Sequence, residues 1–392
     1  MPDRIIQFNV SWLDDENHVQ VNQGWRVQHN NLIGPYKGGL RFHPSVSQSV
    51  FKFLALEQSF KNTLTGLPIG GAKGGSDFNP KGRTDGEIMR FCQAFMTELH
   101  RYIGPTRDVP AGDINVGSRE IGYLFGQYRR LTYQFEGALT GKDPEFGGSH
   151  VRTESTGYGV VYFLEQVLHQ QNDEMKGKTV AISGAGNVAL YAAEKAMQLG
   201  ANVVTLSNSK GFLHVETGLE KEHLTWLREN KSQQDNCLST FAEKQTGTWQ
   251  KDNKPWQISC DIALPCATQN ELDEQDAQQL TNNGCQYLIE GANMPCTAEA
   301  VRVLQTAQVC YVPGKASNAG GVALSTLEMS QNAGFVKHSF EALDEELQTI
   351  MQRIHRNCLI FGKQDDGHID YLKGANQFAF KQLADALVSQ GI

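Results

Sequence analysis

One stretch, residues 178–206, constrains the fold more than any other part of the chain. It contains a short apolar run, the motif Gly-Ala-Gly-Asn-Val-Ala at residues 184–189, a helical pattern and a second apolar run. This order predicts a strand, a tight turn, a helix and a second parallel strand. Gly184 and Gly186 would allow a sharp turn and the close approach of a pyrophosphate to the start of the helix. The stretch therefore indicates a Rossmann-type unit that binds a dinucleotide.

The residues after the second run indicate which dinucleotide is preferred. An NAD site usually carries an acidic residue roughly 20 residues after the first glycine, where it binds the ribose hydroxyls. This chain has Ser207-Asn208-Ser209-Lys210 instead, and hydroxyls with a cation suit a 2′-phosphate better than a carboxylate does. We expect NADP, with NAD possible, and expect Ser207 and Lys210 to contribute to its binding. The alternative is a polar turn without a role, because the acidic residue can come from elsewhere in the fold.

Three lysines and one aspartate stand out in the first part of the chain. Lys73 lies between two glycine pairs at residues 70–75, which we interpret as a loop because glycine is costly inside a helix or strand. Lys37 precedes another glycine pair, Lys61 follows Ser-Phe, and Asp113 follows Pro-Ala-Gly. Together they predict a pocket for a small molecule that carries carboxylates. A lone lysine is usually an ordinary surface charge, but the glycines around Lys37 and Lys73 favour the pocket.

Two of these residues have an ordinary structural alternative. Apolar residues recur at helical spacing over residues 45–64, which brings Glu57 and Lys61 onto or beside the apolar face. The two could form an i, i+4 pair at the edge of that face, or Lys61 could point into a ligand cleft. Asp113 could cap a helix that begins near Ser118, or it could reach Lys73, in which case each group would shift the pKa of the other.

The order of elements predicts an α/β protein of two domains. We expect an N-terminal α/β substrate domain, residues 1–148 plus 376–392, and a Rossmann-type dinucleotide-binding domain, residues 149–375, with a cleft between them. The other expected elements are strands at 4–10, 19–27, 261–267 and 287–293, a capping box at Thr84–Glu87 that starts a helix, a glycine-rich loop at 312–321, and helices at 156–169, 340–361 and 375–389.

Composition argues against several classes of protein. The net charge is −8 with acidic and basic residues interspersed, so the chain offers no basic face for nucleic acid. No apolar run approaches the roughly 20 residues that span a bilayer, and the first residues do not resemble a signal peptide, so we expect a cytoplasmic protein. The eight cysteines are scattered without Cys-x-x-Cys or a histidine pair at ligand spacing, which predicts reduced, mostly buried thiols and no metal site.

Seven motifs run along essentially the whole chain, at residues 34–42, 67–76, 108–113, 139–142, 184–189, 264–272 and 318–322. Together they resemble the motifs of the hexameric, NADP-linked glutamate dehydrogenases of bacteria and fungi, within the Glu/Leu/Phe/Val dehydrogenase family. The resemblance implies that Lys73 is the catalytic lysine and Asp113 the acid–base carboxylate. It implies that Lys61 and Gln58 bind the α-carboxylate of the substrate.

The same resemblance implies the remaining site residues. Lys37 and Ser325 would bind the side-chain carboxylate of the substrate. Further residues would contact the cofactor, the first two at its nicotinamide end and the others along its length: Arg152, Thr156, Asn187, Val188 and Asn293.

By this resemblance the chain would interconvert L-glutamate with 2-oxoglutarate and ammonium, using NADP(H), in nitrogen assimilation and amino acid metabolism. It would form a homo-oligomer, a hexamer, although the sequence begins where family members already have a preceding helical segment. Asn115 stands where glycine is more usual, which could alter the loop that positions Asp113. One alternative is a dehydrogenase for branched-chain or aromatic amino acids, which would not need Lys37 and Ser325. The other is a catalytically silent dinucleotide-binding scaffold, which would have lost Lys73 or Asp113.

Overall fold

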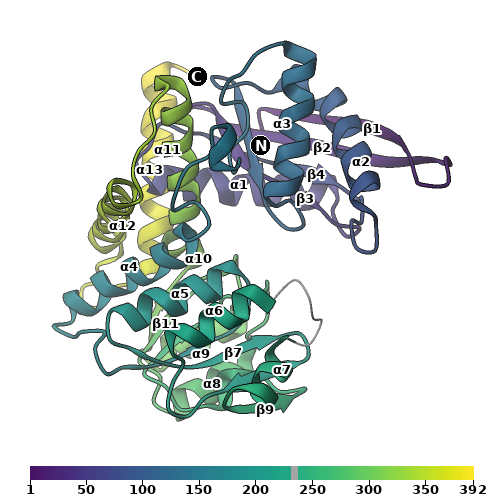
Figure 1. Ribbon diagram of the computed structural model, residues 1–392. Coiled ribbons are helices and arrows are strands. Elements are labelled where there is room, and N and C mark those ends of the chain that lie inside the picture. Colours follow the sequence, from purple (N-terminus) through teal and green to yellow (C-terminus); the bar gives the residue numbers. More distant parts are fainter. Residues whose placement is uncertain (231–236) are drawn as a thin grey trace. The chain divides into compact units, whose positions relative to one another are not determined.

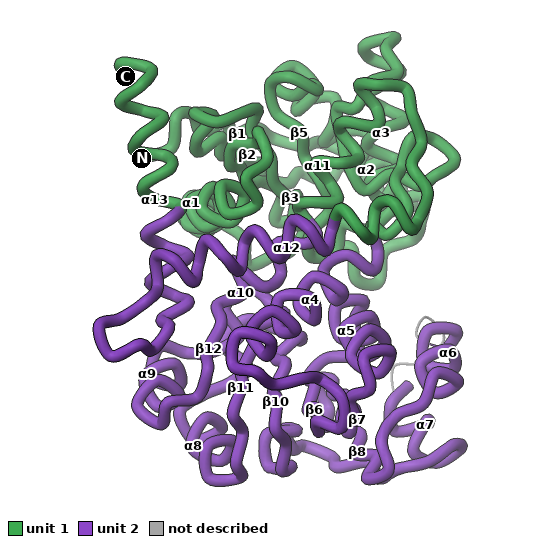
Figure 2. Tube along the Cα trace, turned by 90° about the vertical axis from the view of Figure 1, so that its left-hand side faces the viewer, with its two compact units in different colours: residues 1–152, 322–346, 379–392 green, residues 153–321, 347–378 purple. Residues whose placement is uncertain are grey.

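The computed structural model describes residues 1–230 and 237–392, which divide into two compact units. Unit 1 comprises residues 1–152, 322–346 and 379–392, and unit 2 comprises residues 153–321 and 347–378 (Figure 2). Each unit has its own β-sheet with helices packed on it (Figure 1), which confirms the α/β class and the two-domain organisation. The domain boundaries given above stay a prediction.

The sheet of unit 1 has five strands in the order β1-β2-β4-β3-β5. β1 (Arg4–Leu13) and β2 (Val19–Asn30) form the predicted antiparallel hairpin. β2 continues antiparallel to β4 (Gly71–Ser76), while β3 (Tyr36–Phe42) lies parallel to both β4 and β5 (Asp108–Gly112). The segments that carry the predicted lysines and Asp113 therefore lie on or next to neighbouring strands.

Helices cover both faces of this sheet because side chains alternate between the faces along each strand. α1 (Gln48–Leu64) packs on β2 and β4, where Trp25, Val27 and Phe51 form a small apolar cluster. α2 (Asp85–Leu99) and α3 (Ser118–Thr132) pack together over the opposite face. There they cover the main core of the unit, which is rich in stacked and edge-to-face aromatic rings.

The glycine-rich segment around Lys73 is a buried strand, β4, so its interpretation as a loop is wrong. Neighbouring atoms approach β4 more closely than side chains would allow. A Cβ on Gly71 would lie 2.1 Å from Ser59 Oγ of α1, and a Cβ on Gly74 would lie 2.5 Å from the backbone oxygen of Trp25 in β2. The glycines let a helix and a strand close on β4, and Lys73 is left as its one long side chain.

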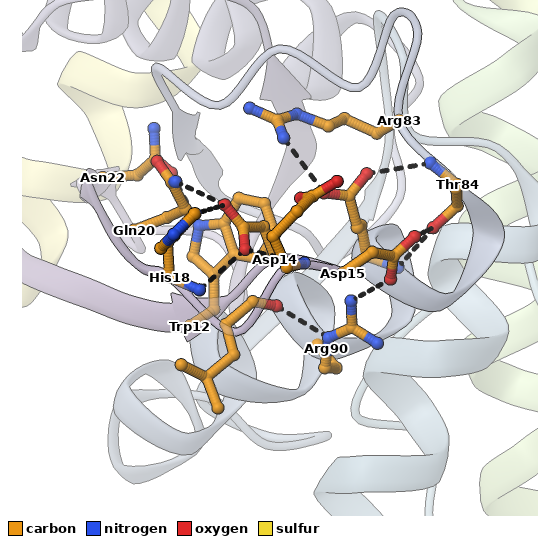
Figure 3. A network of polar contacts seen from close by, with 12 residues as sticks. Trp12, Asp14, Asp15, His18, Gln20, Asn22, Arg83, Thr84 and Arg90 are labelled. Carbon is orange, nitrogen blue, oxygen red and sulfur yellow. Dashed lines mark hydrogen bonds and ion pairs between the residues drawn. The ribbon is translucent and has the colours of Figure 1, made fainter.

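The turn of the β1–β2 hairpin is fixed to the start of α2 (Figure 3). Asp15 accepts a hydrogen bond from Thr84 Oγ1 at 2.7 Å and pairs with Arg90, whose Nε donates to the backbone oxygen of Leu13 at 2.7 Å. Thr84 also forms the predicted capping box with Glu87. These contacts hold one end of the long hairpin against the helix layer.

The sheet of unit 2 has seven strands in the order β12-β11-β10-β6-β7-β8-β9. Five strands are parallel, and β8 and β9 add antiparallel to one edge. The strands are β6 (Thr179–Ile182), β7 (Asn202–Asn208), β8 (Gly211–His214), β9 (Thr248–Lys251), β10 (Ile262–Leu264), β11 (Tyr287–Ile289) and β12 (Cys310–Val312). The strand order reverses between β6 and β10, and ligands of such sheets bind at that switch point.

One helix of unit 2, α4, precedes its first strand, and the others follow strands as a Rossmann-type fold requires, with α5 joining β6 to β7. They are α4 (Ser155–Gln170), α5 (Asn187–Gln198), α6 (Lys221–Asn230), α7 (Cys237–Lys244), α8 (Glu274–Asn282) and α9 (Ala298–Thr306). A short 3-10 turn occurs in unit 2 at Pro255–Gln257, and two occur in unit 1 at His100–Tyr102 and Pro144–Phe146. The predicted strand, turn, helix and strand at residues 178–206 are confirmed.

The last part of the chain is helical. The expected loop at 312–321 contains a short helix, α10 (Gly314–Ser317), so the loop prediction is wrong in its middle: Ser317 Oγ bonds back to the backbone oxygens of Glu290 and Pro313. α11 (Gly320–Gly334), α12 (Phe340–Gly362) and α13 (Tyr371–Gln390) follow.

All eight cysteines are free and seven are buried, as expected. Among the described residues, no helix has both the length and the apolar character that a membrane span requires.

Candidate active site

Lys73 and Asp113 meet in unit 1. Lys73 Nζ lies 3.2 Å from Asp113 Oδ2, and the two side chains are 6% and 14% exposed. The helix-cap alternative for Asp113 is excluded, because the N-cap of α3 is Gly117, whose backbone N–H donates to Glu120 at 2.8 Å. An amine and a carboxylate in contact at a nearly buried site form a pair that can exchange protons with a ligand.

A second cation contacts the same carboxylate oxygen. Arg41 Nε, from β3, donates to Asp113 Oδ2 at 2.9 Å. The loop after Asp113 is tied to the end of β3, because the Phe42 N–H donates to the oxygen of Ile114 and Asn115 Nδ2 donates to the oxygen of Phe42 at 2.9 Å. Asn115 has φ 58°, a left-handed conformation that asparagine tolerates better than most residues. Asparagine is therefore compatible with the conformation of this loop.

The charges shift the pKa of both members of the pair. Burial acts to raise the pKa of Asp113, but the charges and hydrogen bonds of Lys73 and Arg41 outweigh it, so that pKa lies below its usual range. Burial lowers the pKa of Lys73; Asp113 opposes this and Arg41 adds to it. Asp113 is therefore held as the anion, and Lys73 gives up its proton more easily than an ordinary lysine.

A buried ion pair supports the strands beneath this site. Arg26 on β2 pairs with Asp108 on β5 through Nε and Oδ2 at 2.9 Å, and both side chains are fully buried. Arg26 also donates to the backbone oxygen of Gly38, and Gln28 donates to Asp108 at 2.9 Å. Removing one partner would leave a buried charge unpaired, at a cost of about 3–5 kcal/mol. The pair links β2, β3 and β5.

Lys37 is fully buried on β3 and has an unusual environment for a lysine. Its Nζ donates to Thr140 Oγ1 at 2.8 Å. Among the described residues, no carboxylate oxygen lies within the 4.0 Å of an ion pair with it. Burial lowers its pKa well below the ordinary value, and the nearby charge of Arg152 adds to this while that of Glu328 opposes it. A buried ammonium that lacks a carboxylate is suited to receive one from a ligand.

Glu328 on α11 is already engaged by other groups. Its carboxylate pairs with Lys142 Nζ at 2.7 Å, both side chains being 1% exposed or less, and it accepts from the backbone N–H of Gly141 at 2.9 Å. These contacts hold the loop that carries Thr140 against α11. Ser325, 1% exposed, lies three residues before Glu328 and so on the same side of α11. Arg152 also interacts with Glu328 electrostatically.

Gln58 and Lys61 lie on α1, which packs on β4. A Cβ on Gly38 would lie 3.1 Å from Gln58 Cγ, so Gln58 reaches the strand that carries Lys37. Asn62, one turn after Gln58, donates to the backbone oxygen of Lys37 at 3.1 Å. Lys61 is half-buried, and both of its alternatives, the pair with Glu57 and the ligand cleft, stay open.

Unit 2 contains the features expected of a dinucleotide site at its switch point. The strand ends are joined there, because Ser183 Oγ accepts from the N–H of Cys266 at 3.0 Å and Ser207 Oγ accepts from the N–H of Gly184 at 2.9 Å. Gly184 has φ 87°, and a Cβ on Gly186 would meet nothing within 4 Å, which leaves the start of α5 open to a phosphate. A cavity of about 820 Å³ lies beside both glycines. The residues present thus fit a dinucleotide.

The other predicted cofactor residues belong to unit 2, with the exception of Arg152. Asn187 is exposed at the start of α5 and Val188 follows it half-buried, while Asn293 is exposed and accepts from Asn318 at 3.2 Å. Thr156 is half-buried in α4, and Arg152 belongs to unit 1. Ser207 lines the 820 Å³ cavity with Asn208 and Ser209; the exposed Lys210 follows, its N–H donating to Asn208 at 2.8 Å. Cys266 also lines the cavity and is buried, in keeping with a packing residue.

Sequence reasoning assigned no role to Arg41, Thr140 or Glu328. Arg41 stands four residues after Lys37 in the same motif, and Thr140 lies within another quoted motif, so both were visible as polar residues beside glycines. Glu328 carried no such signal, because a glutamate in a helix is ordinarily a surface residue. Its partner Lys142 lies 186 residues away in the chain.

Comparisons with known proteins agree with this geometry. Residues 147–391 match the family model described as Glutamate/Leucine/Phenylalanine/Valine dehydrogenase, and residues 2–130 match its dimerisation domain. The chain is 55% identical over its whole length to the NAD(P)-specific glutamate dehydrogenase of Xylanibacter ruminicola, of which it covers 88%. It is 51% identical, again over its whole length, to the NADP-specific glutamate dehydrogenase of Escherichia coli, of which it covers 87%.

Solved structures give the same result. The fold matches the crystal structure of Plasmodium falciparum glutamate dehydrogenase with a TM-score of 0.98 and 48% identity, covering 100% of this chain and 84% of that one. Another solved glutamate dehydrogenase matches with a TM-score of 0.98 and 49% identity, covering 100% and 88%. With two family models and full-length relatives in agreement, the chain belongs to the Glu/Leu/Phe/Val dehydrogenase family.

Proposed function

We propose that this chain is a glutamate dehydrogenase that interconverts L-glutamate and water with 2-oxoglutarate and ammonium, using NADP(H) and accepting NAD(H) less well. The observation that carries the substrate choice is Lys37, a fully buried ammonium bonded to Thr140 with no carboxylate in ion-pair reach among the described residues. The side-chain carboxylate of glutamate supplies the missing negative charge. Ser325 provides a hydroxyl from α11, and Lys61 with Gln58 binds the α-carboxylate.

The residues of unit 1 then carry the proton chemistry. The nicotinamide, when bound, accepts the hydride from the α-carbon or returns it. Asp113, held as an anion, takes a proton from the substrate nitrogen and gives one back in the reverse direction. Lys73 in its cationic form stabilises the carbonyl oxygen of 2-oxoglutarate, which gains negative charge when ammonia adds to the carbonyl carbon in the reverse direction.

Unit 2 holds the cofactor. Gly184 and Gly186 bring the pyrophosphate to the N-terminus of α5, with Asn187, Val188 and Asn293 along the cofactor. Ser207 and Lys210 bind the 2′-phosphate that distinguishes NADP from NAD. Arg152 and Thr156 contact the nicotinamide end. The choice of NADP is supported by relatives named NADP-specific glutamate dehydrogenase. A relative named NAD(P)-specific glutamate dehydrogenase supports the use of NAD as well.

The comparisons also support a proposal for the larger assembly. The matching dimerisation-domain model and a solved hetero-hexameric glutamate dehydrogenase of Thermus thermophilus support a homo-oligomer, which we propose to be a hexamer. A cytoplasmic location and the domain boundaries at residues 148 and 375 stay predictions.

A paired assay tests the proposal. The purified chain is given 2-oxoglutarate and ammonium with NADPH or NADH, and the loss of reduced nicotinamide absorbance is followed. We expect turnover with both and a higher kcat/KM with NADPH. Lys73→Met and Asp113→Asn should lose roughly 10²–10⁴-fold in kcat, the usual contribution of a proton-transfer group. Lys81→Met, which changes an exposed lysine, is the matched control.

The same assay separates the alternatives. A dehydrogenase for branched-chain or aromatic amino acids would turn over leucine or phenylalanine faster than glutamate. Lys37 argues against this alternative, because its buried ammonium would face the apolar side chain of such a substrate. A silent scaffold would bind NADPH without turnover. The contact between Lys73 and Asp113 argues against the scaffold, because a binding protein needs no such pair.

A further inference from the structure

Arg41 is the charged residue next to the proposed reaction centre to which that chemistry gives no part. It lies on β3, is 13% exposed, and its Nε is 2.9 Å from Asp113 Oδ2. Lys73 Nζ contacts this same oxygen from β4 at 3.2 Å. Both cations therefore occupy one oxygen of the carboxylate, and no described residue donates to Oδ1.

The backbone fixes this arrangement. Arg41 lies beside Gly75 in the parallel register of β3 and β4, and a Cβ on Gly75 would lie 1.8 Å from the oxygen of Arg41. On the other side, a Cβ on Gly39 would lie 2.7 Å from Asp113 Cβ. Gly75 lets β4, which carries Lys73, close on β3 beside Arg41, and Gly39 lets Asp113 approach β3, so the contacts among the three charged groups are a consequence of the strand packing and not chance surface pairs.

We propose, on the basis of the proposed function, that Arg41 is a positioning residue: it holds Asp113 by Oδ2, leaves Oδ1 to exchange the proton with the substrate nitrogen, and sets the pH range in which Lys73 and Asp113 work. Guanidinium suits this task because it stays charged throughout the working pH range and binds carboxylates in a fixed plane. A lysine in its place would keep the charge but not the planar donor.

The electrostatics agree with this role. Arg41 is among the groups that lower the pKa of Asp113, and it is also among those that lower the pKa of Lys73. A fixed positive charge favours the deprotonated form of both partners, whereas Lys73 and Asp113 shift each other in opposite directions.

Other charged groups near the pair do not substitute for Arg41. Arg26 on β2 also lowers the pKa of Lys73, but it is paired with Asp108 on β5, which offsets its charge. α1, which packs on β4, carries Glu57 and Lys61, and neither is among the main causes of the shift at Lys73 or Asp113. Arg41 is therefore the cation whose removal should affect both members together.

The test is the pH profile of kcat/KM for glutamate with NADP⁺, measured for the full chain and for Arg41→Met and Arg41→Lys. For Arg41→Met we expect the acid limb and the alkaline limb both to move to higher pH. At the optimum of the unmutated chain, kcat/KM should fall about 10- to 100-fold, less than the full effect of losing a proton-transfer group. Arg41→Lys should restore both limbs to their original positions, with a smaller loss in kcat.

A merely structural role predicts a lower rate with both limbs unmoved, and that result would overturn the proposal. Limbs that move apart, or an Arg41→Lys profile that shifts like that of Arg41→Met, would also overturn it. If Arg41→Met does not fold, the Arg41→Lys profile decides: limbs displaced from those of the unmutated chain contradict the proposal. An unmutated chain without glutamate turnover would refute the proposed function, and this inference with it, whereas an active unmutated chain with unmoved profiles refutes this inference alone.

Discussion

Two buried lysines in unit 1 allow a sharp test of why Lys37 is there. Lys142 is paired with Glu328 at 2.7 Å, whereas Lys37 is bonded to the neutral Thr140 at 2.8 Å. Replacing each with methionine keeps most of the volume and removes one charge. If Lys37 is kept for a ligand carboxylate, the two changes should alter stability in opposite directions.

The magnitudes follow from the partners. Lys142→Met leaves the carboxylate of Glu328 buried without its cation, which should cost about 3–5 kcal/mol. Lys37→Met removes a buried charge whose desolvation costs several kcal/mol and breaks one hydrogen bond worth about 1 kcal/mol, so the ligand-free protein should become more stable by about 1–3 kcal/mol. The substrate carboxylate would lose its buried partner, at about 2–5 kcal/mol, which lowers kcat/KM for glutamate about 30- to 4000-fold.

The gain in stability should depend on pH. The pKa of Lys37 in the folded chain lies well below the roughly 10.4 of an unfolded lysine. The penalty for burying its charge is therefore fully present below the folded pKa and fades as pH rises toward the unfolded value, where the lysine is neutral in both states. The advantage of Lys37→Met should shrink over the same range.

Thermal unfolding of the ligand-free proteins across pH, together with glutamate kinetics, measures both effects. A raised melting temperature with lost glutamate activity for Lys37→Met, beside a lowered one for Lys142→Met, is the expected pattern. The reasoning fails if Lys37→Met destabilises the chain as Lys142→Met does, or if it keeps kcat/KM for glutamate near that of the unmutated chain.

Substitutions at four further positions test other parts of the structure. Asn115→Ala should lower the free energy of unfolding by about 2 kcal/mol, because it removes one hydrogen bond and places alanine in a left-handed backbone conformation. Asn115→Gly should lose less stability, because glycine adopts that conformation without strain. Thermal unfolding and kcat are measured for both variants, and equal losses of stability would contradict the backbone argument. Lys210→Ala should raise KM for NADP about tenfold and leave that for NAD nearly unchanged, and equal effects in steady-state kinetics would refute the 2′-phosphate role. Gly38→Ala places a Cβ 1.7 Å from the backbone oxygen of Ala72 and should lower the free energy of unfolding, measured with denaturant, by at least about 1–3 kcal/mol. Its control is Gly126→Ala, whose Cβ would meet nothing within 4 Å and which should stabilise α3 by roughly 0.5–1 kcal/mol. If Gly38→Ala leaves stability unchanged, β3 and β4 can separate and the packing argument fails.

The sequence predicted the parts of the fold that local patterns determine. Residues 178–206 carry the glycines, the helix and both strands of a Rossmann unit within one continuous stretch, so their periodicity was sufficient. Capping at Thr84 and the hairpin at the N-terminus were visible for the same reason.

The parts that the sequence did not reveal depend on distant segments. The sequence predicts a loop at β4 because glycine disfavours strands. In the structure, α1 and β2 approach β4 so closely that only glycine fits there. The residues that form α1 and β2 lie elsewhere in the chain, so the sequence around Lys73 does not reveal these approaches. Arg41 and Asp113 lie 72 residues apart, and Lys142 and Glu328 lie 186 apart. A pairing over such distances is set by the folded sheet and helix layers, so no local spacing signals it.

The charges of unit 1 indicate which ligand the site is built for. Arg26 is balanced by Asp108 and Lys142 by Glu328, which also interacts with Arg152, whereas Lys37 and the Lys73–Arg41–Asp113 cluster each have one cation in surplus when both lysines are protonated. Two uncompensated positive charges in a nearly buried setting match a ligand with two carboxylates. An amino acid with an apolar side chain would neutralise one surplus charge and bury the other against hydrocarbon, a cost that glutamate and 2-oxoglutarate avoid. Selectivity for a dicarboxylate thus follows from the surplus charge beside Asp113 and from Lys37, which among the described residues bonds to a hydroxyl and pairs with no carboxylate.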